Sequence, residues 1–249
     1  MKEGSSMIYA IIGPTGVGKT KLSIMLAKEL NKTRPTEIIN CDSMQIYKEL
    51  NIGVAKIKES EKEKIPHHLF DIVSILDDYS VYDYQKQGRA LLDRLLQEGK
   101  NIIIVGGTGL YLKALLYNYT FDGKKGKDEA LYKCQLIALT RDRNGLYEHI
   151  NKRVDEMFEE GLLEEVKALY DQKIRTRAVL TAIGYKELYE YFDGKISLDD
   201  AKEKIKLLSR RYAKRQYTFF KHQFKDVNWY NIDELSFEEI VKDILKNSP

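Results

Sequence analysis

The stretch Gly13-Pro14-Thr15-Gly16-Val17-Gly18-Lys19-Thr20 limits the folds open to this chain more than any other feature. It matches the phosphate-binding pattern G-x-x-x-x-G-K-[ST], a glycine-rich loop between a strand and a helix. The apolar run 7–12 predicts the strand, and the periodic apolar residues of 22–30 predict the helix. Such a loop directs backbone N–H groups and the positive end of the helix dipole at an anion. The sequence therefore predicts a polyphosphate site in which Lys19 adds charge and the Thr20 hydroxyl ligates Mg²⁺.

Short apolar strands alternate with longer helical patterns through the first half of the chain, which indicates a parallel α/β sheet. We expect further strands at 37–40, 101–105 and 135–139, and helices at 110–117 and at 81–97, the latter capped by Ser80. Beyond Asn144 the pattern is helical, with a long helix at about 197–223, a late strand at 227–230 and a short terminal helix. The predicted fold is a P-loop nucleotide-kinase-like parallel sheet core with a helical C-terminal half.

The composition changes in the middle of the chain, where Asp122 to Asp128 contains no apolar residue. We predict the first part of the P-loop core over residues 1–120, a polar linker at 121–128, and the return strand with the helical C-terminal half over 129–249. The only cysteines, Cys41 and Cys134, are far apart and form no C-x-x-C pair, which excludes a disulfide scaffold and a four-ligand structural zinc site. With no signal peptide evident and no apolar run of the roughly 18 residues that span a bilayer, the expected location is the cytoplasm, away from membranes.

The segment Lys202 to Lys225 is rich in Lys and Arg, holds Glu203 as its single acidic residue, and is interleaved with aromatic residues. Basic residues clustered on one element are typical of a nucleic-acid-binding surface. A solvated amphipathic helix whose aromatic residues pack inward explains the pattern equally well, so both interpretations stay open.

Two strand ends narrow the chemistry at the phosphate loop. The strand 101–105 ends in Gly106-Gly107-Thr108-Gly109, without the second acidic residue that P-loop NTPases use for Mg²⁺. Asp42 follows the strand 37–40, and ligands in open parallel sheets bind beyond the carboxyl ends of the strands. Asp42 is therefore expected in the same crevice as Lys19, where it ligates metal through water or acts as a general base. The alternative for Asp42 is a helix cap.

Several short motifs, in order along the chain, resemble those of the tRNA dimethylallyltransferase family. They are Gly13-Pro14-Thr15-x-x-Gly18-Lys19-Thr20, Asp42-Ser43-Met44-Gln45-x-Tyr47, Pro66-His67-His68, Gly106-Gly107-Thr108-Gly109-Leu110-Tyr111, Ala182-Ile183-Gly184-Tyr185-Lys186-Glu187 and Arg211-Tyr212-Ala213-Lys214-Arg215-Gln216. Several are weak individually, but together they extend over nearly the whole chain and form a specific pattern.

The resemblance implies transfer of a dimethylallyl group from its diphosphate to the exocyclic amine of an adenosine beside the tRNA anticodon. It implies that Gly13 to Thr20 hold the diphosphate, with Mg²⁺ near Thr20, and that Lys19, Thr20 and Asp42 are catalytic. Asp42 then accepts the amine proton, Ser43, Met44 and Gln45 contact the inserted base, and Thr108 lines the channel. Reaching a base inside a folded loop requires flipping it out. The enzyme is expected to be a monomer.

The chain departs from the family pattern at two places. Family members usually carry a helical insertion between the Gly-Gly-Thr-Gly helix and the strand at Gln135, where this chain has only its polar stretch. Val54 and Thr181 stand where Thr and Arg or Gln are expected, so no cation of the C-terminal half is assigned to the diphosphate.

Two other classes of function, a different enzyme and a binding module, share some of these features. A small-molecule kinase or an adenylate prenyltransferase has the same phosphate loop but needs no basic helical half. An RNA-binding module that only senses a nucleotide has no use for Asp42. Elsewhere, His67 and His68 are expected to be packed and hydrogen-bonded, Glu59 to Lys64 to form a solvated helical face, and Tyr185 to Phe192 to contribute to the core.

Overall fold

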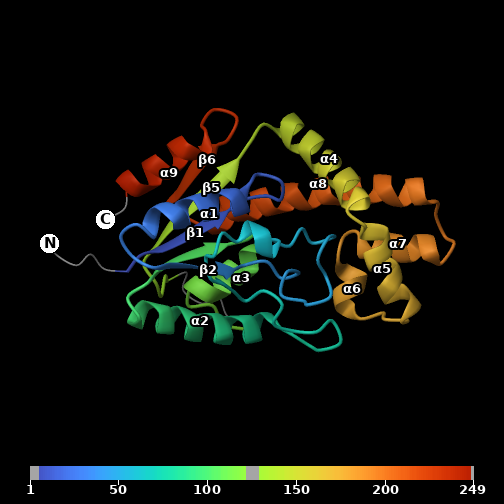
Figure 1. Cartoon of the computed structure of the whole chain (residues 1–249), viewed down its shortest axis with the longest axis horizontal. Helices are drawn as coiled ribbons and strands as arrows, with labels where there is room; N and C mark the ends of the chain where they lie inside the picture. Colours follow the sequence, from blue (N-terminus) through green and yellow to red (C-terminus); the bar gives the residue numbers. More distant parts are fainter. Residues whose placement is uncertain (1–5, 122–128, 248–249) are drawn as a thin grey trace.

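A computed structural model describes residues 6–121 and 129–247, and its centre is one six-stranded sheet (Figure 1). The strand order is β3-β2-β4-β1-β5-β6, and every neighbouring pair is parallel. The strands are β1 (Ile8–Ile12), β2 (Thr36–Asn40), β3 (His67–His68), β4 (Asn101–Val105), β5 (Cys134–Thr140) and β6 (Val227–Asn231). Because β5 and β6 continue the sheet of β1 to β4, both halves of the sequence build one sheet.

The central strands are apolar throughout because helices cover both faces of the sheet. All residues of β1 and β4 are buried. Helices α1 (Lys19–Leu30) and α9 (Phe237–Lys246) pack on one face, and α2 (Val81–Gln97) and α3 (Gly109–Leu116) on the other (Figure 1). Alternate residues of β1 accordingly belong to two different clusters: Tyr9 and Ile11 pack toward α1, whereas Ala10 and Ile12 pack toward α3.

A separate group of helices lies beyond one end of the sheet (Figure 1). It contains α4 (Arg143–Glu159), α5 (Leu162–Asp171), α6 (Arg177–Thr181) and α7 (Tyr185–Phe192), with a third apolar cluster of its own. The 26-residue helix α8 (Leu198–Gln223) begins in this lobe and runs along the molecule to the sheet (Figure 1). Ile205 packs in the apolar cluster of the lobe, and Phe220 packs in the cluster on the α2 and α3 face of the sheet. Helix α8 therefore connects the two parts.

Most predicted elements are confirmed within a few residues. The helix predicted at 81–97 has those bounds, and the Ser80 hydroxyl accepts a hydrogen bond from the Asp83 backbone N–H as the expected N-cap. Tyr185 and Tyr189 are buried, as expected. His67 and His68 form β3, with hydrogen-bond contacts from His67 Nδ1 to the Ile65 carbonyl and from His68 Nε2 to Glu37.

The helix predicted at 59–64 is wrong, although the segment is exposed to solvent as predicted, apart from half-buried Lys62. Only a three-residue 3₁₀ turn forms there, η1 (Glu59–Glu61), and the chain leaves it with positive φ angles at Glu63 and Lys64. The turn is closed by the contact of Lys58 N with the Glu61 carboxylate, too short a motif to start an α-helix. The predicted linker, apart from Phe121, lies outside the described residues.

Candidate active site

Three consecutive strands of the sheet end at one cavity of about 1480 Å³. The phosphate loop, residues 13–20, follows β1, the segment 42–45 follows β2, and the glycine-rich turn 106–109 follows β4. Because β2, β4 and β1 are neighbours and parallel, their carboxyl ends lie at the same edge. The lobe completes the wall with residues of α4, α6 and α8, so the cavity lies between the sheet and the helical lobe.

The phosphate loop leaves the N-terminus of α1 open to a ligand. Gly18 has φ +81°, a left-handed conformation that glycine adopts without strain, and a Cβ there would also meet the Phe237 ring at 2.6 Å. No side chain caps α1, so its first backbone N–H groups have no side-chain partner. Lys19 Nζ donates to the Pro14 carbonyl at 2.7 Å, which holds the ammonium group over the loop.

Lys19 and Asp42 share a desolvated environment and oppose each other in charge. Burial lowers the pKa of Lys19 to about 8, although the Asp42 carboxylate favours its charged form. Burial also raises the pKa of Asp42, against the effects of the Met44 backbone N–H and of Lys19. Asp42 is thus a carboxylate with raised basicity, the property that a general base requires.

Asp42 is held by local hydrogen bonds. Its Oδ1 accepts the Met44 N–H at 2.9 Å, and its own N–H donates to Asn40 Oδ1 at 3.0 Å. Thr108 Oγ1 accepts the Ser43 N–H at 3.0 Å and lies 3.2 Å from the Ser43 hydroxyl, which joins the ends of β2 and β4. The Asp42 carboxyl accepts from Met44 within its own turn, so it caps no helix.

Gln216, a residue given no role by the sequence, connects the two glycine-rich loops. From α8, its Oε1 accepts the Thr15 N–H at 2.8 Å and its Nε2 donates to the Gly107 carbonyl at 2.9 Å. A Cβ on Gly107 would overlap the Gln216 amide, so the glycine is required there. The signal available in the sequence was its spacing: Gln216 is a polar residue on the same helical face as the apolar Ala213 and Phe220, and the structure buries all three.

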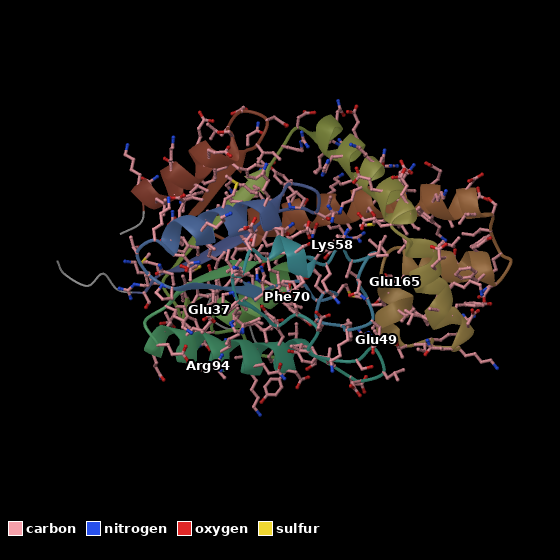
Figure 2. All side chains as sticks on the ribbon, viewed as in Figure 1. Glu37, Glu49, Lys58, Phe70, Arg94 and Glu165 are labelled. Atoms are coloured by element: carbon pink, nitrogen blue, oxygen red, sulfur yellow. The ribbon has the colours of Figure 1, made fainter. Side chains whose placement is uncertain are left out.

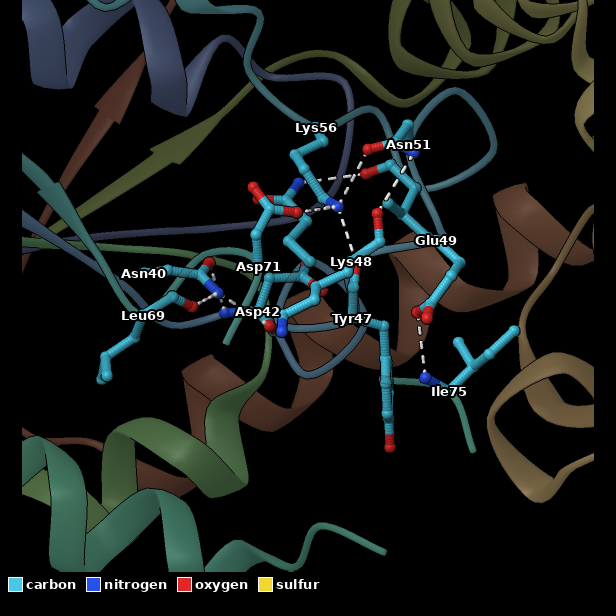
Figure 3. A network of polar contacts seen from close by, with 12 residues as sticks. Asn40, Asp42, Tyr47, Lys48, Glu49, Asn51, Lys56, Leu69, Asp71 and Ile75 are labelled. Atoms are coloured by element: carbon cyan, nitrogen blue, oxygen red, sulfur yellow. Dashed lines mark hydrogen bonds and ion pairs between the residues drawn. The ribbon is translucent and has the colours of Figure 1, made fainter. Parts of the chain in front are cut away.

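The segment after Asp42 is held in place by hydrogen bonds within itself and by one to Asp71. Lys56 Nζ, on a side chain only 6% exposed, donates to the Tyr47 carbonyl at 2.7 Å and to Asp71 at 2.6 Å (Figure 3). Gln45 Nε2 donates to the carbonyls of Val54 and Ala55 at 3.0 and 3.3 Å. The segment 42–56 is thereby folded into one hydrogen-bonded loop, here called the acceptor loop.

Glu165, labelled in Figure 2, fastens the acceptor loop to the helical lobe through hydrogen bonds. Its carboxylate, on α5, accepts the backbone N–H of Ile52 at 2.9 Å and that of Gly53 at 3.3 Å, together with the Tyr185 hydroxyl. A carboxylate that accepts two backbone N–H groups and a phenol fixes both the loop and the helix that carries it. Nothing in the sequence pattern singles out Glu165 or Lys56.

The cavity brings together most of the predicted site residues. Its wall includes nine of them: Thr15, Gly16, Gly18, Lys19, Thr20, Asp42, Ser43, Met44 and Gln45. Gly13, Pro14 and the side chain of Val17 lie buried behind the loop, and Thr108 lies behind Ser43 rather than in the wall. Among the described residues, no three His, Cys, Asp or Glu side chains are grouped so as to hold a metal ion.

Comparison with known proteins agrees with this geometry. A family model described as IPP transferase matches residues 45–131 and 120–223. The tRNA dimethylallyltransferase of Anoxybacillus flavithermus is 40% identical over 299 aligned positions, covering 96% of this chain and 94% of that protein. The chain belongs to the tRNA dimethylallyltransferase family. The family member from Bacillus subtilis is 41% identical over 296 positions, covering 93% of each chain.

Solved structures show the same family. The full-length tRNA isopentenylpyrophosphate transferase of Bacillus halodurans superposes with a TM-score of 0.88 at 35% identity, covering 97% of this chain and 95% of that one. The alignment with the Anoxybacillus enzyme has 299 positions and this chain has 249 residues, so at least 50 residues of that enzyme have no counterpart here. The two matches of the family model overlap at 120–131, where the polar linker was predicted.

Proposed function

We propose that this protein transfers a dimethylallyl group from dimethylallyl diphosphate to the exocyclic amine of an adenosine beside the anticodon of tRNA. The observation that carries the proposal is the placement of an anion-binding loop and of Asp42 on one cavity. The loop suits the diphosphate that leaves, and the carboxylate suits the amine that attacks. Family membership supports the same reaction.

The side chains divide the chemistry between the two ends of the cavity. Lys19 and the N–H groups at the start of α1 stabilise the negative charge of the departing diphosphate. Asp42 accepts the proton of the amine as the carbon–nitrogen bond forms. Ser43, Met44 and Gln45 hold the flipped adenine against the donor, and Thr108 positions Ser43. Gln216 keeps the two glycine-rich loops at a fixed separation.

Mg²⁺ fits this site as a partner of the diphosphate. Thr20 lines the cavity at the start of α1 and offers a hydroxyl oxygen, and Asp42 offers a carboxylate. Because the described residues contain no cluster of three ligating side chains, oxygen atoms of the diphosphate and water would complete the coordination. The ion would supply positive charge against the leaving group.

The exposed cations of α8 suit a tRNA partner, but only at one end of the helix. Lys204 pairs with Glu190, Lys206 pairs with Asp155 at 2.8 Å, and Arg210 contacts Asn151. Arg211 and Lys214 are exposed and have no hydrogen bond or ion pair within the described chain. The free cations therefore lie on the second half of α8, beside Tyr212 and Gln216 of the cavity wall.

We infer a monomeric, cytosolic enzyme. Cys41 and Cys134 are both free thiols, as a reducing compartment maintains. No helix in the described ranges has the length and apolarity to cross a membrane.

The test is incubation with labelled dimethylallyl diphosphate, Mg²⁺ and bulk tRNA, followed by digestion to nucleosides. We expect the label in a modified adenosine. The kinase alternative is tested by thermal protection: the prenyl diphosphate should stabilise the protein at concentrations where ATP shifts the melting temperature little. Strong protection by ATP with phosphate transfer to a small acceptor, and none by the prenyl donor with or without tRNA, would replace the proposal by a kinase.

A further inference from the structure

The side chain of Asn40, the last residue of β2, holds the backbone on both sides of Asp42 (Figure 3). Its Oδ1 accepts the Asp42 N–H at 3.0 Å, and its Nδ2 donates to the Asp42 carbonyl at 3.1 Å. The Asp42 carboxylate is fixed in turn, because its Oδ1 accepts the Met44 N–H at 2.9 Å. Asn40 therefore sets the direction in which the Cα–Cβ bond of Asp42 leaves the backbone, and Met44 sets the rotation of the carboxylate.

Asn40 is fully buried and is itself held by other elements. Its Nδ2 also donates to the Leu69 carbonyl at 2.9 Å, and the Tyr84 hydroxyl donates to the Asn40 carbonyl at 2.8 Å. The opposite orientation of the amide would place its oxygen against two carbonyl oxygens, so the network permits only one orientation. Moving this amide would leave buried polar groups without partners, which costs free energy. Asn40 is thus a rigid support for Asp42.

The bond to Leu69 joins the end of β2 to a turn that holds the acceptor loop at a second point. Leu69 and Asp71 have φ angles of +61° and +53°, a left-handed conformation that costs a non-glycine residue roughly 1–2 kcal/mol. Such a backbone persists only where the surrounding contacts determine it. Asp71 also binds Lys56 Nζ, which donates to the Tyr47 carbonyl. The turn therefore fixes the acceptor loop on both sides of the residues expected to contact the adenine.

We propose that Asn40 is a positioning residue for the transfer step and fixes the Asp42 carboxylate where the amine proton is released. This inference rests on the proposed function. In the reaction, the adenosine nitrogen bonds to the first carbon of the prenyl group as the bond from that carbon to the diphosphate oxygen breaks. The electron pair of the broken bond stays on the diphosphate, and the amine proton goes to Asp42.

A general base must lie within hydrogen-bond reach of the proton that it accepts. A displacement of about 1 Å costs roughly a hundredfold in rate. Because Asn40 is fully buried, it touches neither substrate and acts only through Asp42. Its loss should therefore slow the chemical step and leave the binding of both substrates almost unchanged.

The experiment compares Asn40→Ala and Asn40→Ser with the control Asn101→Ala. Asn101 is also a buried asparagine, at the start of the neighbouring strand β4, and its Oδ1 accepts the Met7 N–H at 3.0 Å at the edge of the sheet opposite the cavity. Single-turnover transfer, pyrophosphate affinity with Mg²⁺ and tRNA affinity are measured for each variant. We expect Asn40→Ala to slow transfer roughly tenfold to a hundredfold, with both affinities within about threefold of the wild type.

Asn40→Ser keeps a hydroxyl that can accept the Asp42 N–H, so it should recover part of the lost rate. Asn101→Ala should lower the melting temperature, as Asn40→Ala does, but transfer at the wild-type rate. The comparison between the two asparagines therefore separates the loss of a buried hydrogen bond from the loss of alignment of the base.

A double-mutant cycle with Asp42→Asn tests whether Asn40 acts through the base. Once the base is gone there is nothing to align, so adding Asn40→Ala to Asp42→Asn should slow transfer by less than about threefold. An equal loss in both backgrounds, or a rate of Asn40→Ala equal to that of Asn101→Ala, would overturn the assignment. If Asn40→Ala does not fold, Asn40→Ser takes its place in the cycle.

The proposed function and the role of Asn40 fail in different ways. Wild-type protein that transfers no prenyl group to tRNA would overturn the proposed function, and the positioning role with it. An active wild type whose Asn40 variants behave like Asn101→Ala would overturn the positioning role alone.

Discussion

The two sides of the cavity are built in different ways. The phosphate side is one continuous stretch, Gly13 to Thr20, whose conformation follows from its glycines and from the helix that it opens. The acceptor side is the loop 42–56, held by Lys56 from within and by Thr108 and Glu165 from distant elements. A contiguous backbone site depends on few side chains, whereas a loop fastened by distant contacts changes position when any of them is lost.

Asp42 lies where the two sides meet, and its loss should have the largest effect. Asp42→Asn keeps the shape but removes the base, so we expect transfer in a single turnover to fall by about 10²–10⁴. Affinity for pyrophosphate and for tRNA should stay within a few fold. Single-turnover rates equal to wild type together with a collapse of tRNA binding would make Asp42 a binding residue and contradict the division of roles.

Lys19→Ala should be the next most damaging change. The ammonium group contacts only the Pro14 carbonyl through a hydrogen bond, so its removal leaves the fold intact but takes one charge from the transition state. Loss of such a contact costs about 3 kcal/mol, or roughly a hundredfold in rate. The measurement is kcat at saturating donor and Mg²⁺, with the melting temperature as a control. Near-normal turnover would count decisively against the phosphate role.

The pH profile tests the two charged groups in the unmodified protein. Lys19 is positively charged below its pKa of about 8 and neutral above it, so kcat/KM for the donor should decline as pH rises through that value. Asp42 must be deprotonated to act as a base, and burial raises its pKa, so transfer should also decline as pH falls through the raised value. The alkaline decline should disappear in Lys19→Ala and the acidic one in Asp42→Asn. A decline that persists in the matching variant belongs to another group.

The same contrast explains what the sequence could predict. The phosphate loop, Gly13 to Thr20, could be predicted because its motif, strand and helix are adjacent in sequence. The elements β1, α1 and β4 could be predicted because each has a characteristic apolar pattern. Asp42 could be placed in the cavity because the carboxyl ends of parallel strands share one edge. The family was also predicted from its motifs and is confirmed by the comparisons, whereas the order of the strands follows only from the structure.

The contacts that hold the acceptor side could not be predicted from the sequence, for a physical reason. Glu165 acts on Ile52 and Gly53 across more than 110 residues, and a solvent-facing glutamate in an amphipathic helix has the same pattern. The side chain of Lys56 is buried, but its segment has the sequence of an ordinary polar loop, so nothing in the pattern predicts that burial. The error at 59–64 has the same origin, because a run of alternating charges resembles an exposed helix whether or not tertiary contacts allow one.

Glu165→Gln tests whether the acceptor side depends on its distant contact. The amide retains one acceptor oxygen, but it cannot serve the Ile52 and Gly53 N–H groups and the Tyr185 hydroxyl together. An unsatisfied buried donor costs about 1–3 kcal/mol, so we expect a lower melting temperature and roughly a tenfold loss in kcat/KM for tRNA. Pyrophosphate affinity should not change.

The matched control is Glu164→Gln, an exposed glutamate at the preceding position of α5. Glu164→Gln should leave kcat/KM for tRNA and the affinity for pyrophosphate at their wild-type values. If Glu165→Gln weakens pyrophosphate and tRNA equally, the two sides of the cavity are not independent and the contrast between them is lost.

The smallest effect is expected on α8, where the paired and free cations allow a direct comparison. Replacing Arg211 and Lys214 together by alanine should flatten the dependence of tRNA affinity on salt by about one unit for each lost phosphate contact. Replacing Lys204 and Lys206, which are bound to Glu190 and Asp155, should leave the slope unchanged. The measurement is the dissociation constant for tRNA as a function of salt concentration for the wild type and both variants.

Equal charge is removed in both variants, so net charge alone cannot distinguish them. Steering by the overall field of the protein predicts similar slopes for the two, whereas direct phosphate contacts predict a change only for Arg211 and Lys214. Equal slopes would mean that α8 binds tRNA only through its overall charge. A larger change on replacing Lys204 and Lys206 would mean that tRNA displaces Glu190 and Asp155 and binds along the lobe, away from the open end of the cavity.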